Sequence, residues 1–156
     1  MGNAFALILQ NAAGEQEEMK TLQAVNTAVA SYGLQLNASG LLQLVQERRR
    51  ALQQTGRVEY AGGIGGSLIN AFCDSPFISE EEYADILCAL QELFYHIKDD
   101  TADKVSDEEL MAFLKQKFNG VCRGEIDLLQ REARTLIRRI KGYEEENSGI
   151  EEEEDD

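Results

Sequence analysis

The segment Gly62-Gly63-Ile64-Gly65-Gly66-Ser67 has the pattern most suggestive of ligand chemistry in this chain. Glycines directly before a helix N-terminus can present bare amides to an anion, and the helix dipole adds to the attraction. The segment lacks the Lys-Ser/Thr pair of a P-loop, the G-x-G-x-x-G spacing and a βαβ context. We therefore favour a structural loop, in which glycine adopts backbone angles that let two helices approach closely. The candidate set for a small anion or small molecule is Arg57, Gly62, Gly63, Gly65, Gly66 and Ser67.

The side chains that could act as nucleophiles or metal ligands are few and scattered. Cys73, Cys88 and Cys122 are an odd number at wide spacing, which fits neither a disulfide framework nor a zinc site. Cys73 follows a predicted short helix, whose dipole disfavours a thiolate at that end. His96, the only histidine, has no cysteine at ligand spacing. We expect no catalytic residue, no metal and no cofactor.

Arg48 interrupts the apolar face of a predicted helix. That helix starts at the N-cap Asn37, ends before Gly56, and has Leu41, Leu44, Val45 and Leu52 on its inner face. An unpaired buried guanidinium costs several kcal/mol, so Arg48 should meet a carboxylate. We expect a structural ion pair of Arg48 with Glu59 or Asp74, in preference to a ligand-binding role.

Two helix faces are candidate surfaces for a partner protein. The helix predicted from Glu80 to Lys98 has a main apolar stripe and a second strip of Ala84, Cys88 and Tyr95, so it is either central or at an interface. The last helix separates Ile126, Leu129, Ala133, Leu136, Ile137 and Ile140 from Arg131, Arg134, Arg138 and Lys141 on the opposite side. A further hypothesis is that the acidic C-terminal segment folds back to screen this basic stripe.

Helix-start and helix-stop signals predict an all-α protein, a compact bundle of about six helices. Two capping boxes, Ser79 to Glu82 and Ser106 to Glu109, each precede apolar residues at helical spacing. The other predicted helices cover 15–32, ended by Gly33, the Asn37-capped helix, a short helix from Leu68 to Phe72, and the last helix from Ile126.

Charge is unevenly distributed along the 156 residues. The net charge is −14, and residues 144–156 hold nine acidic residues and no basic one. Such a segment cannot bury enough apolar surface to fold, so we expect one helical domain over 1–143, flexible or briefly extended over 1–14, and a disordered tail over 144–156. The acidic balance disfavours nucleic acid, and no stretch reaches the length of a membrane span. The cysteine usage fits reduced thiols in the cytoplasm.

Several strings in combination, Tyr32-Gly33-Leu34, Gly56-Arg57-Val58-Glu59, Ala71-Phe72-Cys73-Asp74-Ser75-Pro76 and Ser106-Asp107-Glu108-Glu109-Leu110, resemble an uncharacterised family of small proteins from clostridia-like bacteria. The resemblance covers about Leu22 to Ile140. It implies a bacterial cytosolic protein and carries no catalytic or binding residues with it.

Two function classes remain open from the sequence. The first is a non-enzymatic helical module that binds another protein, based on the two helix faces and the lack of a reactive cluster. The second is a small-anion or small-molecule binding protein, possible also as an enzyme, with its site at Gly62–Ser67. The sequence leaves the oligomeric state open.

Overall fold

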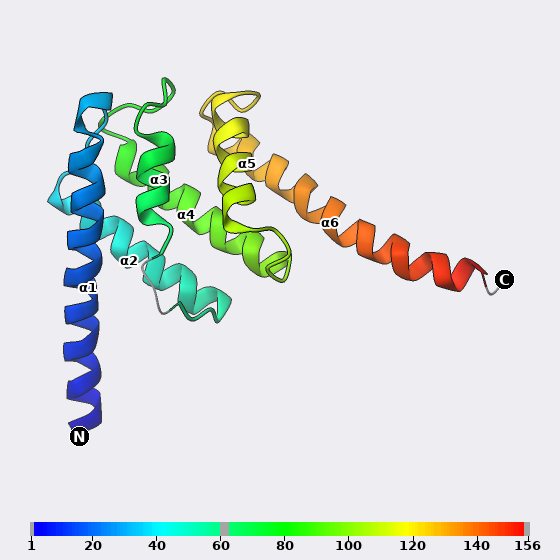
Figure 1. The fold of residues 1–156 in the computed structure, drawn as a ribbon, viewed down its shortest axis with the longest axis horizontal. Coiled ribbons are helices and arrows are strands. Elements are labelled where there is room, and N and C mark those ends of the chain that lie inside the picture. The colour runs from blue at the N-terminus through cyan, green and yellow to red at the C-terminus, as the bar shows by residue number, and fades with distance from the viewer. Residues whose placement is uncertain (1, 60–62, 155–156) are drawn as a thin grey trace. The chain divides into compact units, whose positions relative to one another are not determined.

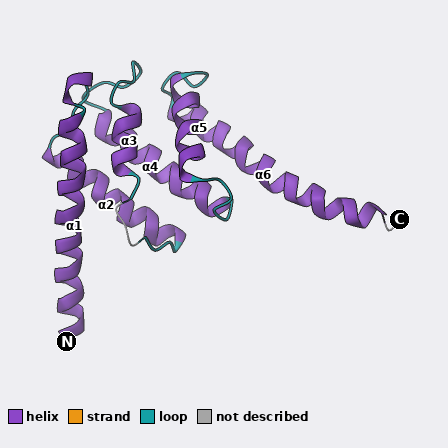
Figure 2. Cartoon of the chain, viewed as in Figure 1, coloured by secondary structure: helices purple, strands orange, loops and turns teal. Residues whose placement is uncertain are grey.

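The computed structural model describes the backbone of residues 2–59 and 63–154, and the side chains of residues 14–59 and 63–142. Every regular element in this part of the chain is a helix (Figure 2). The predicted all-α class with six α-helices is therefore confirmed. Backbone contacts divide the chain into two compact units, residues 1–92 and 93–156, where the sequence led us to expect a single domain.

The first unit contains α1 (Gly2–Ala28), the 3₁₀ turn η1 (Ala30–Tyr32), α2 (Ala38–Thr55), α3 (Gly65–Phe72) and the first half of α4 (Tyr83–Asp100) (Figure 1). α1 packs against both α2 and α3. Gly33 follows η1 with φ of 123°, which explains why glycine stands at the predicted stop. α1 begins at Gly2, so the backbone of 2–14 is helical rather than extended.

The ends of α2 follow the predicted capping chemistry. The Asn37 side chain accepts a hydrogen bond from the Gly40 amide at 2.8 Å, which satisfies one of the free donors of the first turn. At the other end, Gly56 adopts a left-handed φ of 65°. Its amide and that of Arg57 donate to the carbonyls of Gln53 and Leu52. Both predicted caps of this helix are confirmed.

Of the two predicted serine capping boxes, one caps a helix and the other does not. Ser106 Oγ accepts from the Glu109 amide at 3.2 Å and caps α5 (Asp107–Asn119), as predicted. Ser79 does not cap α4: residues 80–82 form a turn in which the Glu82 amide donates to the Ser79 carbonyl at 3.2 Å, and the helix starts at Tyr83. The prediction for Ser79 is wrong because backbone bonds between residues three apart occupy the place of the first helical turn.

Buried polar side chains in the first unit form hydrogen bonds with the backbone of neighbouring segments. Buried Asn26 of α1 donates to the Leu36 carbonyl at 2.8 Å and accepts from the Leu36 amide at 3.0 Å. Buried Gln91 of α4 donates to the Leu44 carbonyl of α2 at 2.9 Å. These bonds satisfy the Oδ1 and Nδ2 atoms of Asn26 and the Nε2 atom of Gln91, which would be costly to bury without partners. The apolar core around them includes Leu22, Leu41, Leu44, Val45, Leu68, Ile69, Phe72, Tyr83, Leu87 and Leu90.

The second unit contains the rest of α4, α5 and α6 (Ile126–Glu154). α5 packs on α6, and the buried residues of the unit include Phe94, Ile97, Leu110, Leu114, Phe118, Leu129 and Ala133. Lys98, 5% exposed, donates from Nζ to the Val105 carbonyl at 2.7 Å and lies 2.8 Å from Asp107 Oδ1. This buried cation joins the end of α4 to the start of α5.

Most of the C-terminal acidic segment belongs to α6. The helix continues without interruption through Glu154, and residues 155 and 156 lie outside the described part. The disorder predicted for 144–156 rests on the small amount of apolar surface that this segment can bury, and it stays a prediction. Within the described residues, no helix combines the length and apolar character needed to cross a bilayer.

Candidate functional site

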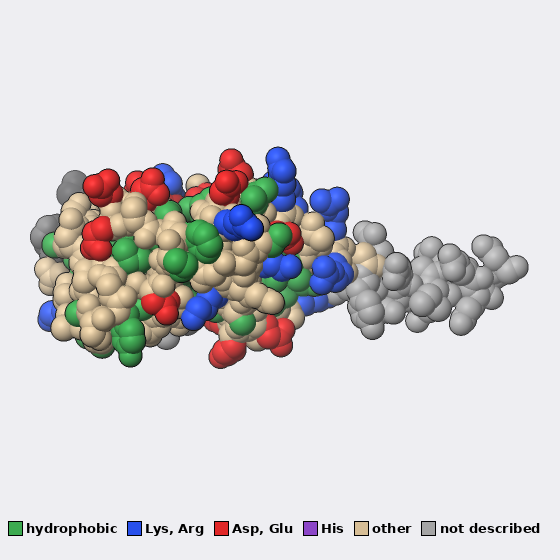
Figure 3. Space-filling model, turned by 90° about the horizontal axis from the view of Figure 1, so that it is seen from above, with side chains coloured by type: hydrophobic (Ala, Val, Ile, Leu, Met, Phe, Trp, Pro, Cys, Tyr) green, Lys and Arg blue, Asp and Glu red, His purple; other side chains and the backbone are tan. Residues whose placement is uncertain are grey.

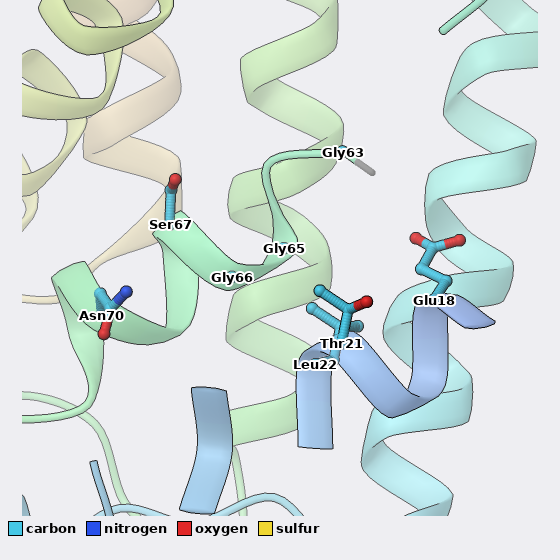
Figure 4. A pocket seen from close by; sticks show the side chains of 8 residues that line it. All are labelled: Glu18, Thr21, Leu22, Gly63, Gly65, Gly66, Ser67 and Asn70. Atoms are coloured by element: carbon cyan, nitrogen blue, oxygen red, sulfur yellow. The ribbon is translucent and has the colours of Figure 1, made fainter. Parts of the chain in front are cut away.

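The glycine-rich segment forms one wall of a pocket between α1 and α3 (Figure 4). The pocket has a volume of about 290 Å³ and is lined by Glu18, Thr21, Leu22, Gly63, Gly65, Gly66, Ser67 and Asn70. Four of the predicted ligand residues therefore lie together here. Gly62 lies outside the described residues, and Arg57 is not part of the pocket lining.

Close packing explains the glycines of this wall. A Cβ on Gly63 would overlap Nε of Arg48, and a Cβ on Gly65 would lie 2.8 Å from Leu22 Cδ2. The glycines with positive φ in the described part are Gly33, Gly56 and Gly124, so Gly63 and Gly65 adopt ordinary backbone angles. These contacts agree with the interpretation that the glycines let neighbouring elements approach closely. Glycine is needed because there is no space for a side chain, and not because the backbone angles are unusual.

The one charged side chain among the described residues of the pocket lining is acidic. Glu18 contributes a carboxylate, and burial raises the pKa of this group even though the nearby Arg48 opposes the change. The predicted cation, Arg57, has its Nε 3.7 Å from Glu59 Oε2. A carboxylate on the wall favours a neutral or cationic small molecule over an anion.

Arg48 is the centre of a buried ion cluster. It is 8% exposed; Nη2 donates to Glu59 Oε1 at 2.9 Å and Nη1 donates to Glu18 Oε2 at 3.2 Å. The structure thus pairs Arg48 with one of its two predicted partners, Glu59, and with Glu18, which was not predicted. Asp74 is exposed, and its charge raises the pKa of the Tyr83 hydroxyl after the larger effect of burial. The expected partnership of Arg48 with Asp74 is not formed.

Glu18 has a signal in the sequence that could have identified it. It lies on the same helical face as Leu22 and Val25 of α1, and Val29, directly after α1, continues the spacing of four, three and four residues. Leu22 and Val29 are buried. An acidic residue on a buried face needs a cation, and Arg48 was already known to need an anion. The helical spacing that predicts a buried Arg48 therefore also predicts an ion pair between Glu18 and Arg48.

The second apolar strip of α4 is internal. Cys88 is 8% exposed and Tyr95 is fully buried, while Ala84 is half-buried. A Cβ on Gly40 of α2 would lie 3.2 Å from Ala84 Cβ, so the start of α2 covers this end of the strip. The predicted docking surface at these three residues is corrected: α4 is apolar on two sides because it is a central helix.

The buried thiols are poor nucleophiles. Burial raises the pKa of Cys88 to about 12, and the nearby acidic Glu47 adds to the effect. Burial also raises the pKa of Cys122. Cys73 is buried and its Sγ lies 3.7 Å from the Asn70 carbonyl. The raised pKa values of Cys88 and Cys122 keep these two thiols protonated near neutral pH, which makes them unreactive. Among the described residues, no group of His, Cys, Asp and Glu is arranged to hold a metal ion.

The basic stripe of α6 is exposed as the helical spacing requires. We call Arg131, Arg134, Arg138 and Lys141 the basic face of α6; all four are exposed. Figure 3 shows Lys and Arg side chains gathered along this end of the described surface. On the opposite side, Leu129 and Ala133 are buried, whereas Leu136, Ile137 and Ile140 are half-buried.

The fold and these sites define the class: a small all-α protein with a buried ion cluster, a small pocket and one strongly basic helix face. A family model matches residues 21–146, and its description is a family of unknown function, DUF6323. Because the match covers most of the chain, the protein belongs to this family. The predicted relation to an uncharacterised family is confirmed in that form. No curated protein and no solved structure gives a significant match.

Proposed function

We propose that this chain is a non-enzymatic helical module that binds another protein through the basic face of α6. The observation that carries the proposal is the charge segregation of this helix. Four cations lie within one face and are all exposed, in a chain whose net charge is −14. Exposed cations on one face attract an acidic surface and direct its orientation.

A protein partner fits this charge pattern better than nucleic acid. Directly after the basic face, the same helix carries Glu144, Glu145 and Glu146 in its sequence. Duplex nucleic acid carries a negative charge about every 1.7 Å, so along α6 it would meet these carboxylates as well. An acidic segment of a protein can place its charges opposite Arg131–Lys141 alone. The setting that we propose is the bacterial cytoplasm, which the free thiols of Cys73, Cys88 and Cys122 support.

A charge-reversal experiment tests the basic face. The test variant carries Arg131→Glu, Arg134→Glu and Arg138→Glu, and the control carries Lys20→Glu, Lys115→Glu and Arg123→Glu, which are exposed cations elsewhere. Both variants have the same net charge. Crosslinking in the native cell, with wild type as reference, should capture a protein that the control retains and the test variant loses. Equal capture by both variants would contradict the proposal.

The pocket between α1 and α3 supports a second candidate, the binding of a small polar molecule. Its volume of about 290 Å³ suits a ligand of a few heavy atoms. Its Glu18 carboxylate and the polar groups of Thr21, Ser67 and Asn70 favour an amine or a polyol. Titration with methylammonium or glycerol should shift the backbone amide signals of Gly65 and Gly66, and inorganic phosphate should not. Silence with all three probes would remove this candidate.

A further inference from the structure

The aromatic side chains that reach the surface lie at one end of the first unit. Tyr32 of η1 is 64% exposed, and Phe77, in the segment between α3 and α4, is 40% exposed. Every other Phe or Tyr side chain within 14–59 and 63–142 is buried or half-buried. Aromatic rings gain much free energy from burial, so two exposed rings at one place are typical of a surface that a partner covers.

Two hydrogen bonds hold the segments with these rings together. The Leu34 amide donates to the Cys73 carbonyl at 3.2 Å, and the Gln35 amide donates to Glu80 Oε1 at 3.2 Å. The segment that follows η1 is thereby bonded to both ends of the segment between α3 and α4, and Figure 1 shows the two at the same end of the unit. The exposed rings therefore belong to one surface.

The charged residues of these two segments are all acidic. Residues 29–40 contain no charged residue, and residues 73–82 contain four acidic residues and no basic one. All four are exposed, and within the described side chains no cation forms an ion pair with them. Figure 3 looks onto this end and shows acidic and hydrophobic side chains together. We call this set the acidic aromatic end: Tyr32, Phe77, Asp74, Glu80, Glu81 and Glu82.

Stabilisation of α4 does not account for this surface. Glu80, Glu81 and Glu82 directly precede α4, where carboxylates interact favourably with the positive end of the helix dipole. Asp74 instead follows the C-terminal end of α3, where the dipole disfavours a carboxylate. The dipole also gives no reason for two exposed rings.

A buried hydroxyl beside the carboxylates has no hydrogen-bond partner among the described residues. Tyr83 is fully buried, and its Oη forms no hydrogen bond there. Burial raises the pKa of this hydroxyl, and the nearby Cys73, Glu80 and Asp74 add to the effect, so the oxygen faces the acidic aromatic end. A cation that the carboxylates attract would offer the donor that this oxygen lacks.

We propose that the acidic aromatic end binds an arginine-containing segment of a partner protein. A guanidinium stacks with its face on an aromatic ring and donates from its edge to carboxylates, so arginine uses both kinds of group on this surface. Lysine has a point charge and no planar group to stack. The inference goes beyond the proposed function, because this surface belongs to the first unit and takes a basic partner, whereas the basic face of α6 belongs to the second unit.

Residue-resolved NMR titration of the purified full chain tests the binding with two defined probes. The probes are blocked peptides in which arginine, or lysine in its place, alternates with glycine. Residues 144–154 continue α6 instead of folding back over its basic face, and their carboxylates attract both probes. The readout is therefore the amide signals of Gln35 and Phe77, which report on the acidic aromatic end. The arginine peptide should shift them with an affinity about fivefold higher than the lysine peptide.

Two pairs of substitutions separate the rings from the charges. Tyr32→Leu with Phe77→Leu keeps apolar side chains but removes the rings, and should lower the affinity for the arginine peptide about fivefold, to the level of the lysine peptide. Glu81→Gln with Glu82→Gln removes charge only and should weaken both peptides alike. Circular dichroism of each variant checks that the helical signal is unchanged.

The control for charge is Glu17→Gln with Glu108→Gln, at exposed sites elsewhere, which has the same net charge and should bind as wild type does. Equal affinity for both peptides that the ring substitutions leave unchanged, or shifts confined to residues 144–154, would overturn the proposal. If the signals of the acidic aromatic end moved with rising concentration of the chain alone, a second copy would be the occupant, and a separate partner would be ruled out. Loss of the basic face of α6 should leave this binding unchanged, so the proposed function and this inference can fail separately.

Discussion

Arg48 joins three parts of the first unit through a single side chain. Its guanidinium binds Glu18 of α1 and Glu59 of the segment after α2, and it fills the space that a side chain on Gly63 would need. The planar group has several donors in a fixed arrangement, so it can satisfy two carboxylates at once. The missing side chain of Gly63 therefore leaves the space that the Arg48 side chain occupies.

The Glu18 carboxylate makes the stability of this unit depend on pH. Its pKa in the fold is raised above the ordinary value of 4.5, chiefly by burial. The protonated form is thus favoured by folding, and this contribution is present below the ordinary pKa and lost as pH rises through the raised one. Glu18→Gln mimics the protonated form, so its unfolding free energy relative to wild type should increase from pH 4.5 toward neutrality. Urea unfolding across that range measures the difference.

A matched control lies one residue away. Glu17 is exposed on the same helix, and Glu17→Gln should change the unfolding free energy by less than about 0.5 kcal/mol. If wild type and Glu18→Gln gave parallel stability curves from acid to neutral pH, the carboxylate would not be coupled to folding in this way.

The helix ends that depend on neighbouring residues could be predicted from the sequence. The caps at Asn37, Gly56 and Ser106 depend on residues within one turn, and the structure forms all three. The start of α4 was misplaced because a turn of three residues competes with the first helical turn at Ser79, and both use the same backbone donors.

Contacts between residues far apart in the sequence could not be predicted from the sequence. The burial of Arg48 follows from helical periodicity, and Glu59 is only 11 residues away. Glu18, 30 residues away, becomes its partner only because α1 packs on α2. In the same way, periodicity identified the second strip of α4, but only the position of α2 shows that Ala84 is covered from within the chain.

The two serines give a direct test of helix capping. Ser106→Ala removes an acceptor from the Glu109 amide and should lower the unfolding free energy by about 1 kcal/mol. Ser79→Ala removes no such bond, because the Glu82 amide donates to the backbone carbonyl of Ser79. It should change stability by less than about 0.5 kcal/mol. Thermal or urea unfolding compares them, and equal losses in the two variants would show that both serines act as caps.

At the scale of the whole molecule, each unit has its own buried charge cluster. In the first unit, Arg48 holds Glu18 and Glu59, and in the second, Lys98 holds the Val105 carbonyl and Asp107. Helix α4 contributes residues to both units. Each cluster joins segments of one unit only, so its loss should loosen that unit first.

Hydrogen exchange of two variants tests whether the units open separately. Arg48→Met removes the cation that bridges Glu18 and Glu59 and should lower amide protection in α2 and α3 by about 3 kcal/mol, with a smaller change in α5. Lys98→Met leaves the Val105 carbonyl without its donor and should lower protection in α5 by about 2 kcal/mol, with a smaller change in α2. Asp74→Ala, at an exposed site, serves as the control. An equal loss of protection throughout the chain in both variants would mean that the two units unfold as one, because only a single cooperative transition spreads a local defect evenly.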